Sequence, residues 1–188
     1  ATQTDDAIIV GNSLGGLAAW RYAAQGAGDV SGLVLLAPGG VPHNGVGDTP
    51  VDVPMMLSFY LKNAPEAGVR AALQAMHADP SIGTDAMVTQ FADMMKGSGN
   101  GEAFVARAGS FTLPAPEADM AKVMVPTLIL WGAQDTVLPP SHADVFAASM
   151  PNAEIRILDQ VGHMPQSEAR DAVATAIREI GAQTGDGS

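Results

Sequence analysis

Residues 7–16 of the chain read AIIVGNSLGG, and this stretch decides the fold. Its first four residues are apolar and mostly β-branched, which predicts a short, fully buried strand. A sharp turn follows, and apolar residues at helical spacing then predict a helix over residues 14–25. Residues 30–37 (VSGLVLLA) predict a second buried strand. A strand, a helix and a second strand in this order form a βαβ unit, so we expect a parallel sheet.

The same pattern returns in the last third of the chain. Residues 125–131 (VPTLILW) predict a third buried strand, and the alternating residues 153–158 (AEIRIL) predict a fourth. We expect a helix over 141–149 with Ser141 as its N-cap, and one amphipathic helix over 166–180. The tail from residue 181 is expected to fray. The chain is therefore predicted to be an α/β protein with a mostly parallel, doubly wound sheet.

The middle of the chain has a different character, because proline and glycine break it into short helix-like pieces. These pieces are expected at 55–63, 66–77, 85–96 and 102–108, and six of the ten methionines fall among them. We read the middle as a helical insertion. The expected organisation is an α/β core over 1–42, the helical insertion over 43–118 and the rest of the core over 119–188.

Composition excludes several classes of partner. The net charge of −11 argues against nucleic acid, which needs a Lys/Arg surface, and against docking on an anionic membrane. No apolar run approaches the roughly 20 residues of a membrane span, and we expect a cytoplasmic protein with a small-molecule substrate. The chain has no cysteine, so thiol nucleophiles and zinc–thiolate sites are excluded. We expect no cofactor and no metal, since no metal-binding histidine spacing occurs.

The turn after the first strand, Gly11 to Gly15, matches the pattern Gly-x-Ser-x-Gly. The pattern alone is weak, but its place between a buried strand and a helix strengthens it. Ser13 would project its hydroxyl from a strained turn in which Gly11 and Gly15 come too close for side chains. The helix beginning at Leu14 would point N–H groups at a reacting carbonyl. The alternative is a phosphate-binding loop, although no P-loop motif, lysine or arginine lies nearby.

A serine nucleophile needs a base and a carboxylate that orients it. Asp135 follows the third predicted strand and His163 follows the fourth, so both are expected at the sheet edge where Ser13 lies. The chain order Ser, Asp, His is that of α/β-hydrolases. Asp159 is an alternative acid, and His163 could instead be an ordinary loop histidine. The weaker histidine candidates are His43, His77 and His142.

Four segments carry a resemblance to the α/β-hydrolase superfamily: AIIVGNSLGG, GLVLLAPGG, PTLILWGAQDTVLP and VGHMPQSE. They cover about residues 5–42 and 119–182. GNSLGG and GHMPQSE are similar to meta-cleavage-product hydrolases, and equally to the hydrolase-like domain of some acetoin dehydrogenase acyltransferase subunits. Haloalkane dehalogenases are similar too, but they carry aspartate at the position of Ser13. The resemblance implies that the middle region is a cap over the active site.

The resemblance also implies a missing part. The family's sheet has eight strands, four of them before the strand of the nucleophile, whereas six residues precede Ala7 here. We therefore expect this chain to be the C-terminal half of the sheet, completed by the N-terminal half of the same protein or by another chain. Without these missing strands, the strand at 7–10 would be an unpaired apolar edge of the sheet. The loop that supplies the second oxyanion donor would also be lost, so we expect weak activity from this chain alone.

The expected function is that of a serine hydrolase. Ser13 attacks the carbonyl of an ester or of a carbon–carbon/acyl bond and forms an acyl-enzyme, and the Leu14 N–H stabilises the oxyanion. His163 takes and returns the proton, and Asp135 orients the imidazole of His163. A small, mostly apolar substrate is expected, with Val137 and Met164 in the pocket lining. The cap methionines either line this pocket or pack the cap onto the core. Two alternatives stay open: an acyltransferase with the same triad, and a non-catalytic binding protein that keeps the fold.

Overall fold

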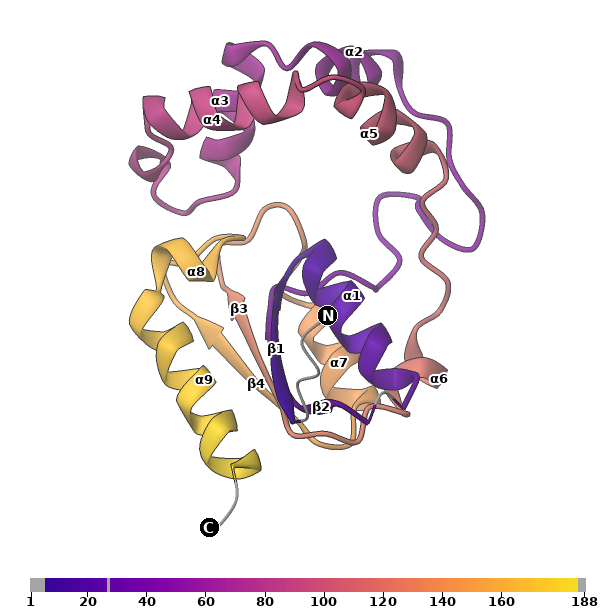
Figure 1. Ribbon diagram of the computed structural model, residues 1–188, viewed down its shortest axis with the longest axis vertical. Helices are drawn as coiled ribbons and strands as arrows, with labels where there is room; N and C mark the ends of the chain where they lie inside the picture. The colour runs from indigo at the N-terminus through magenta and orange to yellow at the C-terminus, as the bar shows by residue number, and fades with distance from the viewer. Residues whose placement is uncertain (1–5, 27, 186–188) are drawn as a thin grey trace.

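The computed structural model describes residues 6–26 and 28–185. Within them, four strands form one parallel sheet in the order β1-β2-β3-β4 (Figure 1). The strands are β1 (Ala7–Asn12), β2 (Val30–Leu36), β3 (Thr127–Gly132) and β4 (Ala153–Leu158). Helix α1 (Leu14–Ala24) joins β1 to β2, which pair in parallel from Ala7↔Val30 to Asn12↔Leu36. The predicted βαβ opening is therefore confirmed.

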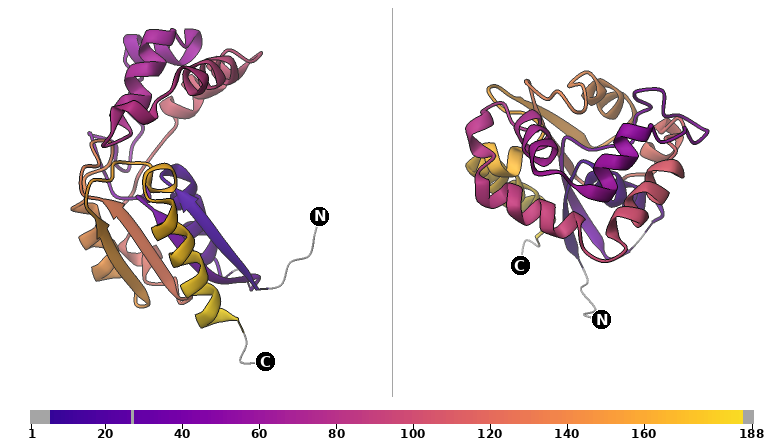
Figure 2. Two further views of the ribbon diagram at one scale, coloured as in Figure 1. Left: turned by 90° about the vertical axis from the view of Figure 1, so that its left-hand side faces the viewer. Right: turned by 90° about the horizontal axis from the view of Figure 1, so that it is seen from above.

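Helices cover both faces of the sheet, because the side chains of its inner strands alternate between two cores. On one face, α1, α6 (Glu117–Met120) and α7 (His142–Ser149) pack on Leu33 and Leu35 of β2. On the other face, α9 (Arg170–Thr184) packs on Val34 and Leu36 (Figures 1 and 2). The first core contains three fully buried aromatic rings in edge-on contact: Trp20, Trp131 and Phe146. The doubly wound α/β class is confirmed.

Strand β1 differs from its prediction as a fully buried strand. It lies at the edge of the described sheet and pairs only with β2 there, and most of its side chains are only half-buried. Val10 keeps 42% of its surface exposed. The apolar pattern indicated burial on both faces of the strand, which an edge position in these residues does not supply.

The middle of the chain forms a layer of helices above the carboxyl ends of the strands (Figure 1). The helices are α2 (Met55–Asn63), α3 (Glu66–Ala75), α4 (Asp85–Met95) and α5 (Asn100–Gly109), with a 3-10 turn, η1, at Pro80–Ile82. All four predicted pieces are helical, although α3 ends two residues early and α5 begins two residues early. α3 and α4 share a small core of their own around Val69, Leu73 and Val88. The division into domains at residues 43 and 118 stays a prediction.

The structure corrects the expectation that the methionines of this layer line the pocket. None lies in the lining of the cavity beside Ser13. Met95 is buried in the core between α3 and α4, whereas Met55 and Met56 are 83% and 74% exposed. Apolar composition alone could not say which face of α2 turns toward solvent.

The C-terminal region corrects three expectations. The single helix predicted over 166–180 is two helices, α8 (Pro165–Glu168) and α9, because the backbone of Ala169 leaves the helical region. α9 continues to Thr184, so the chain does not fray at 181, and the last three residues lie outside the described ranges. Ser141 precedes α7, but its side chain makes no capping hydrogen bond. In the described ranges, no helix has the length and apolarity needed to cross a membrane.

Candidate active site

Ser13 occupies the sharp turn between β1 and α1. Its φ of 53° lies in the left-handed region, which side chains other than glycine seldom adopt. Two backbone bonds hold this conformation: the Ser13 N–H donates to Leu36 O at 3.0 Å, and the Gly39 N–H donates to Ser13 O at 2.8 Å. The end of β2 and the segment that follows it therefore hold the strained residue through both its N–H and its carbonyl.

The glycines of the turn are required at different positions from those expected. A Cβ on Gly11 would lie 2.5 Å from the Gly15 carbonyl oxygen, so Gly11 must lack a side chain, as predicted. A Cβ on Gly15 would have no atom of the described residues within 4 Å. The expectation that Gly15 is too crowded for a side chain is therefore wrong. The second crowded glycine is Gly16, whose Cβ would lie 2.8 Å from Cβ of Pro38. The turn thus packs against the chain just after β2 at Gly16, the residue that follows the Gly-x-Ser-x-Gly motif.

The first turn of α1 brings backbone N–H groups beside Ser13 that have no backbone partner among the described residues. The first bond of the helix runs from the Leu17 N–H to Ser13 O at 3.0 Å, so the Leu14 N–H precedes the hydrogen-bonded ladder. The side chain of Leu14 is about half exposed and lines the cavity with Ser13. The expected oxyanion donor is therefore at the helix end that faces the cavity.

Asp135 follows β3 and is buried, with 6% of its surface exposed. Its Oδ1 accepts from the backbone N–H groups of Val137 and Leu138 at 2.8 and 2.9 Å. Its Oδ2 lies 2.8 Å from Nδ1 of His163. Both oxygens are thus engaged, which fixes the carboxylate in one orientation. The alternative acid, Asp159, is exposed at the end of β4.

His163 follows β4 and is 3% exposed. With Nδ1 facing Asp135, its Nε2 is turned to the opposite side of the ring and is the nitrogen left for a reacting group. Its backbone is held at both ends: the N–H donates to Met76 O at 2.8 Å, and the carbonyl accepts from Asn12 Nδ2 at 3.0 Å. The buried pair of Asp135 and His163 is therefore a rigid unit.

The structure does not place the Ser13 hydroxyl in a hydrogen bond with the His163 ring, as far as the described residues go. Asn12 joins the turn of Ser13 to the loop of His163, because its Nδ2 donates to His163 O at 3.0 Å. The same nitrogen donates to Leu36 O at 2.9 Å. Asn12 Oδ1 accepts from Gln166 Nε2 at 3.2 Å. No role for Asn12 is predicted from the sequence. The one available signal was an amide directly before the candidate nucleophile.

The other three histidines lie in different surroundings. His142 is buried at the start of α7, with its ring 6.2 Å from Trp131 and 5.2 Å from His43, both in edge-on contact. Burial lowers the pKa of His142 from 6.5, and the charge of His43 adds to this, while Asp135 opposes it. His77 is also buried, which its polar sequence context did not suggest. No cluster of three or more metal-ligating side chains occurs in the described part of the chain.

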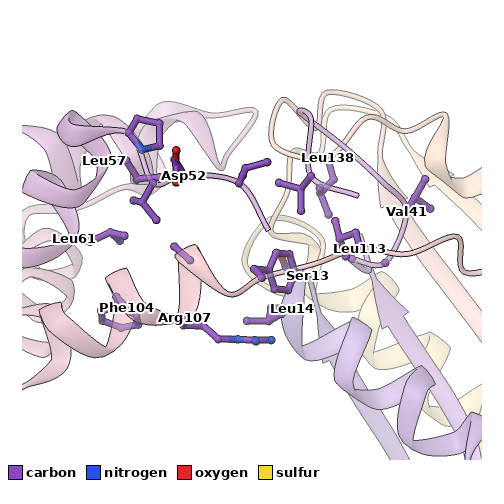
Figure 3. Close-up of a pocket in the computed structure, with 18 residues that line it drawn as sticks. Ser13, Leu14, Val41, Asp52, Leu57, Leu61, Phe104, Arg107, Leu113 and Leu138 are labelled. Carbon is purple, nitrogen blue, oxygen red and sulfur yellow. The ribbon is translucent and has the colours of Figure 1, made fainter. Parts of the chain in front are cut away.

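A cavity of about 460 Å³ opens beside Ser13, between the core and the helical layer (Figure 3). Leu57 and Leu61 of α2, Phe104 of α5 and Leu138 are among its apolar walls. The charged residues of its described lining are Asp52 and Arg107, and Figure 3 shows the Arg107 side chain extending from α5 toward Leu14.

Val137 and Met164, the expected lining residues, are not part of the described wall of this cavity. The backbone of Val137 instead binds Asp135, and Met164 precedes the short helix α8. Both residues lie next to the candidate acid or base in sequence, and a place for them in a substrate pocket stays a prediction.

Comparison with known proteins gives one family and several relatives. The model of the "Alpha/beta hydrolase family" matches residues 1–176. The chain is 26% identical over 172 residues to a 2-hydroxy-6-oxo-6-phenylhexa-2,4-dienoate hydrolase of Burkholderia cepacia, covering 89% of this chain and 60% of that protein. It is also 26% identical over 174 residues to monoacylglycerol lipase ABHD6 of Mus musculus, covering 82% of this chain and 48% of that protein. The chain thus spans about half to three fifths of the length of these relatives.

Among solved structures, a mutant of the meta-cleavage product hydrolase CumD from Pseudomonas fluorescens IP01 superimposes with a TM-score of 0.78. The identity is 21%, and the match covers 96% of this chain and 66% of that one. At this identity the match shows a shared fold and nothing more. The family match over nearly the whole sequence, together with the parallel sheet and the strained serine turn, leads to one conclusion: this chain belongs to the alpha/beta hydrolase family.

Proposed function

We propose that Ser13, Asp135 and His163 form the catalytic triad of a serine hydrolase. The observation that carries the proposal is the buried contact of 2.8 Å between Asp135 Oδ2 and His163 Nδ1. The side chain of Asn12 links this pair to the strained turn of Ser13 through its hydrogen bond to the carbonyl of His163. A carboxylate held on Nδ1 fixes the tautomer in which Nε2 accepts a proton. This is the state that a general base needs.

In the proposed reaction, Ser13 Oγ forms a bond to the acyl carbon while its proton passes to Nε2 of His163. The carbonyl electrons move onto oxygen, which accepts a hydrogen bond from the Leu14 N–H. The bond to the leaving group then breaks as His163 returns the proton to it. Water repeats the sequence on the acyl-enzyme and releases the acid. The contact between Ser13 and His163 has to tighten when substrate binds, as is common for catalytic hydrogen bonds.

The proposed substrate is small and mostly apolar, because the walls of the cavity beside Ser13 are mostly apolar. Arg107 adds a positive charge at this wall, and we propose that it pairs with an anionic group of the substrate. The names of the two relatives are those of a hydrolase of a phenylhexadienoate and of a monoacylglycerol lipase. The proposal therefore covers cleavage of an ester and of a carbon–carbon bond beside a carbonyl.

A fluorophosphonate probe tests the proposal, since it labels a serine only where a base activates it. The protein expressed from its complete gene should be labelled at Ser13, and Ser13→Ala should lose both labelling and ester hydrolysis. Ser31→Ala, at a serine in β2 outside the cavity, is the matched control and should behave as the unchanged protein. Hydrolysis that persists in Ser13→Ala would reject the assignment. Labelling that is absent from the unchanged protein would favour a binding protein that keeps the fold.

A further inference from the structure

The segment 75–78, at the end of α3, binds both loops that carry the candidate acid and base. Thr136, next to Asp135, donates its hydroxyl to Ala75 O at 2.8 Å. The His163 N–H donates to Met76 O at 2.8 Å. Figure 2 shows how this end of the helical layer comes down to the loops above the sheet. The helical layer is thus attached to the site through specific hydrogen bonds to the backbone carbonyls of this segment.

Glu168, the last residue of α8, connects this segment to the loop of His163. Its Oε1 accepts from the Ala78 N–H at 2.6 Å, and its Oε2 accepts from the Gly162 N–H at 2.8 Å. Gly162 directly precedes His163. Hydrogen bonds to an ionised carboxylate are about twice as strong as neutral ones, so one side chain holds two backbone segments that lie 84 residues apart in sequence, at 78 and 162.

The two segments touch so closely that glycine is required at position 162. A Cβ there would lie 2.7 Å from Ala78 N and 2.9 Å from the carbonyl carbon of His77. Both N–H groups therefore face the same carboxylate across a narrow gap. An amide of the same length cannot replace it, because glutamine offers one acceptor oxygen and would turn its NH₂ toward the second N–H.

A second contact keeps the segment in place without Glu168. Nδ1 of His77 lies 2.7 Å from Leu73 O, and its Nε2 lies 2.9 Å from Ser167 Oγ. The Ser167 hydroxyl also bonds to Met164 O at 2.9 Å. Removing the Glu168 carboxylate should therefore loosen the peptide before His163 while the segment 75–78 stays attached and the fold is kept.

From this geometry we infer that Glu168 is a positioning residue for His163: it fixes the Gly162 peptide and ties it to the segment 75–78. The inference rests on the proposed function, in which His163 is the base. A base acts well only when its nitrogen is held at the reacting hydroxyl, and a misplacement of about 1 Å can cost 100-fold in rate. Glu168 does not line the cavity beside Ser13, so it should affect the rate of reaction and not the binding of substrate.

The test compares the maximal rate and the half-saturating concentration of fluorophosphonate labelling in the protein from its complete gene. Glu168→Gln should lower the maximal rate about tenfold or more and leave the half-saturating concentration within twofold. Glu117→Gln, at an exposed glutamate of α6, is the charge-matched control and should leave both values unchanged. Val88→Ala, in the core between α3 and α4, lowers stability without touching the loop of His163 and should also keep the rate.

Each outcome decides the inference. A rate in Glu168→Gln within twofold of the unchanged protein overturns it, as does a loss no larger than that in Val88→Ala. If the unchanged protein is not labelled at Ser13, the proposed function fails and the positioning role fails with it. If Glu168→Gln does not fold, Glu168→Asp decides instead: it keeps the charge but is shorter by one methylene. A maximal rate at least threefold below that of the unchanged protein then supports the inference, and an unchanged rate overturns it.

Discussion

The side-chain amide of Asn12 donates to the backbone carbonyl of His163 at 3.0 Å, and so joins the turn of Ser13 to the loop of the candidate base. The same nitrogen donates to Leu36 O at 2.9 Å, at the end of β2. One carbonyl lies at the end of β2 and the other in the loop after β4, and one NH₂ group donates to both. This side chain therefore ties the turn of Ser13 to the loop of the candidate base.

Asn12→Asp should lower kcat about tenfold or more, because a carboxylate would face two carbonyl oxygens where an NH₂ group now donates. Hydrolysis of a p-nitrophenyl ester measures this directly. The control is Asn152→Asp, because Asn152 also donates to a carbonyl, Met124 O at 2.6 Å, but lies at the other end of the sheet. Equal kcat values for the two variants would show that Asn12 has no special role at the site.

Arg107 should discriminate between charged and neutral substrates. Because it carries the positive charge of the described cavity wall, Arg107→Met should raise KM about tenfold for an ester with a carboxylate in its acyl part. KM for the neutral ester of similar size should stay within about twofold. Lys62→Met, on α2 but outside the cavity lining, should change neither value. A rise in KM for both esters would mean that Arg107 shapes the wall and does not recognise charge.

Much of the sheet and of the candidate site could be predicted from the sequence, for reasons that are local. The β-branched run before the serine turn and the glycine at position 11 determine strand, turn and helix within a few residues. Asp135 and His163 could be located because parallel strands bring their carboxyl ends to one edge. The buried pair that they form agrees with that reasoning, although their catalytic roles remain predictions.

Contacts between distant segments could not be predicted in the same way. His77 read as the end of a polar helix, yet it is buried against Ser167, 90 residues further along the chain. Glu168 read as part of a continuous amphipathic helix, whereas the helix breaks at Ala169 and the Glu168 carboxylate accepts from the Gly162 N–H. One sequence gives no information on which loops meet across the gap between the helical layer and the sheet.

The protonation of His142 should make the folded protein less stable in mild acid. Burial and the charge of His43 lower the folded-state pKa of His142 below 6.5, and Asp135 opposes them. The unfolded chain therefore binds more protons between that lowered value and about pH 6.5, so the free energy of unfolding falls as pH drops through this window. His142→Gln should flatten the pH dependence of the urea midpoint between pH 7.5 and 5.

The matched variant for this effect is His43→Gln, which removes the neighbouring positive charge but keeps His142. It should reduce the fall in the urea midpoint without abolishing it, because burial of His142 remains the larger cause. A pH dependence that is the same in His142→Gln as in the unchanged protein would assign the acid sensitivity to another group.

Strand β1 should gain a neighbour in the active protein. Its outer backbone groups pair with no described strand, and Val10 remains 42% exposed beside them. Such an apolar edge favours pairing with a further strand. Amide hydrogen exchange tests this prediction: the amides of residues 7–12 should exchange slowly in the protein from its complete gene and much faster in the 188-residue chain. The amides of β3, which has a neighbour on each side, serve as the internal control and should exchange slowly in both. Fast exchange along β1 in the complete protein would mean that the edge stays open and that the site works beside an unpaired strand.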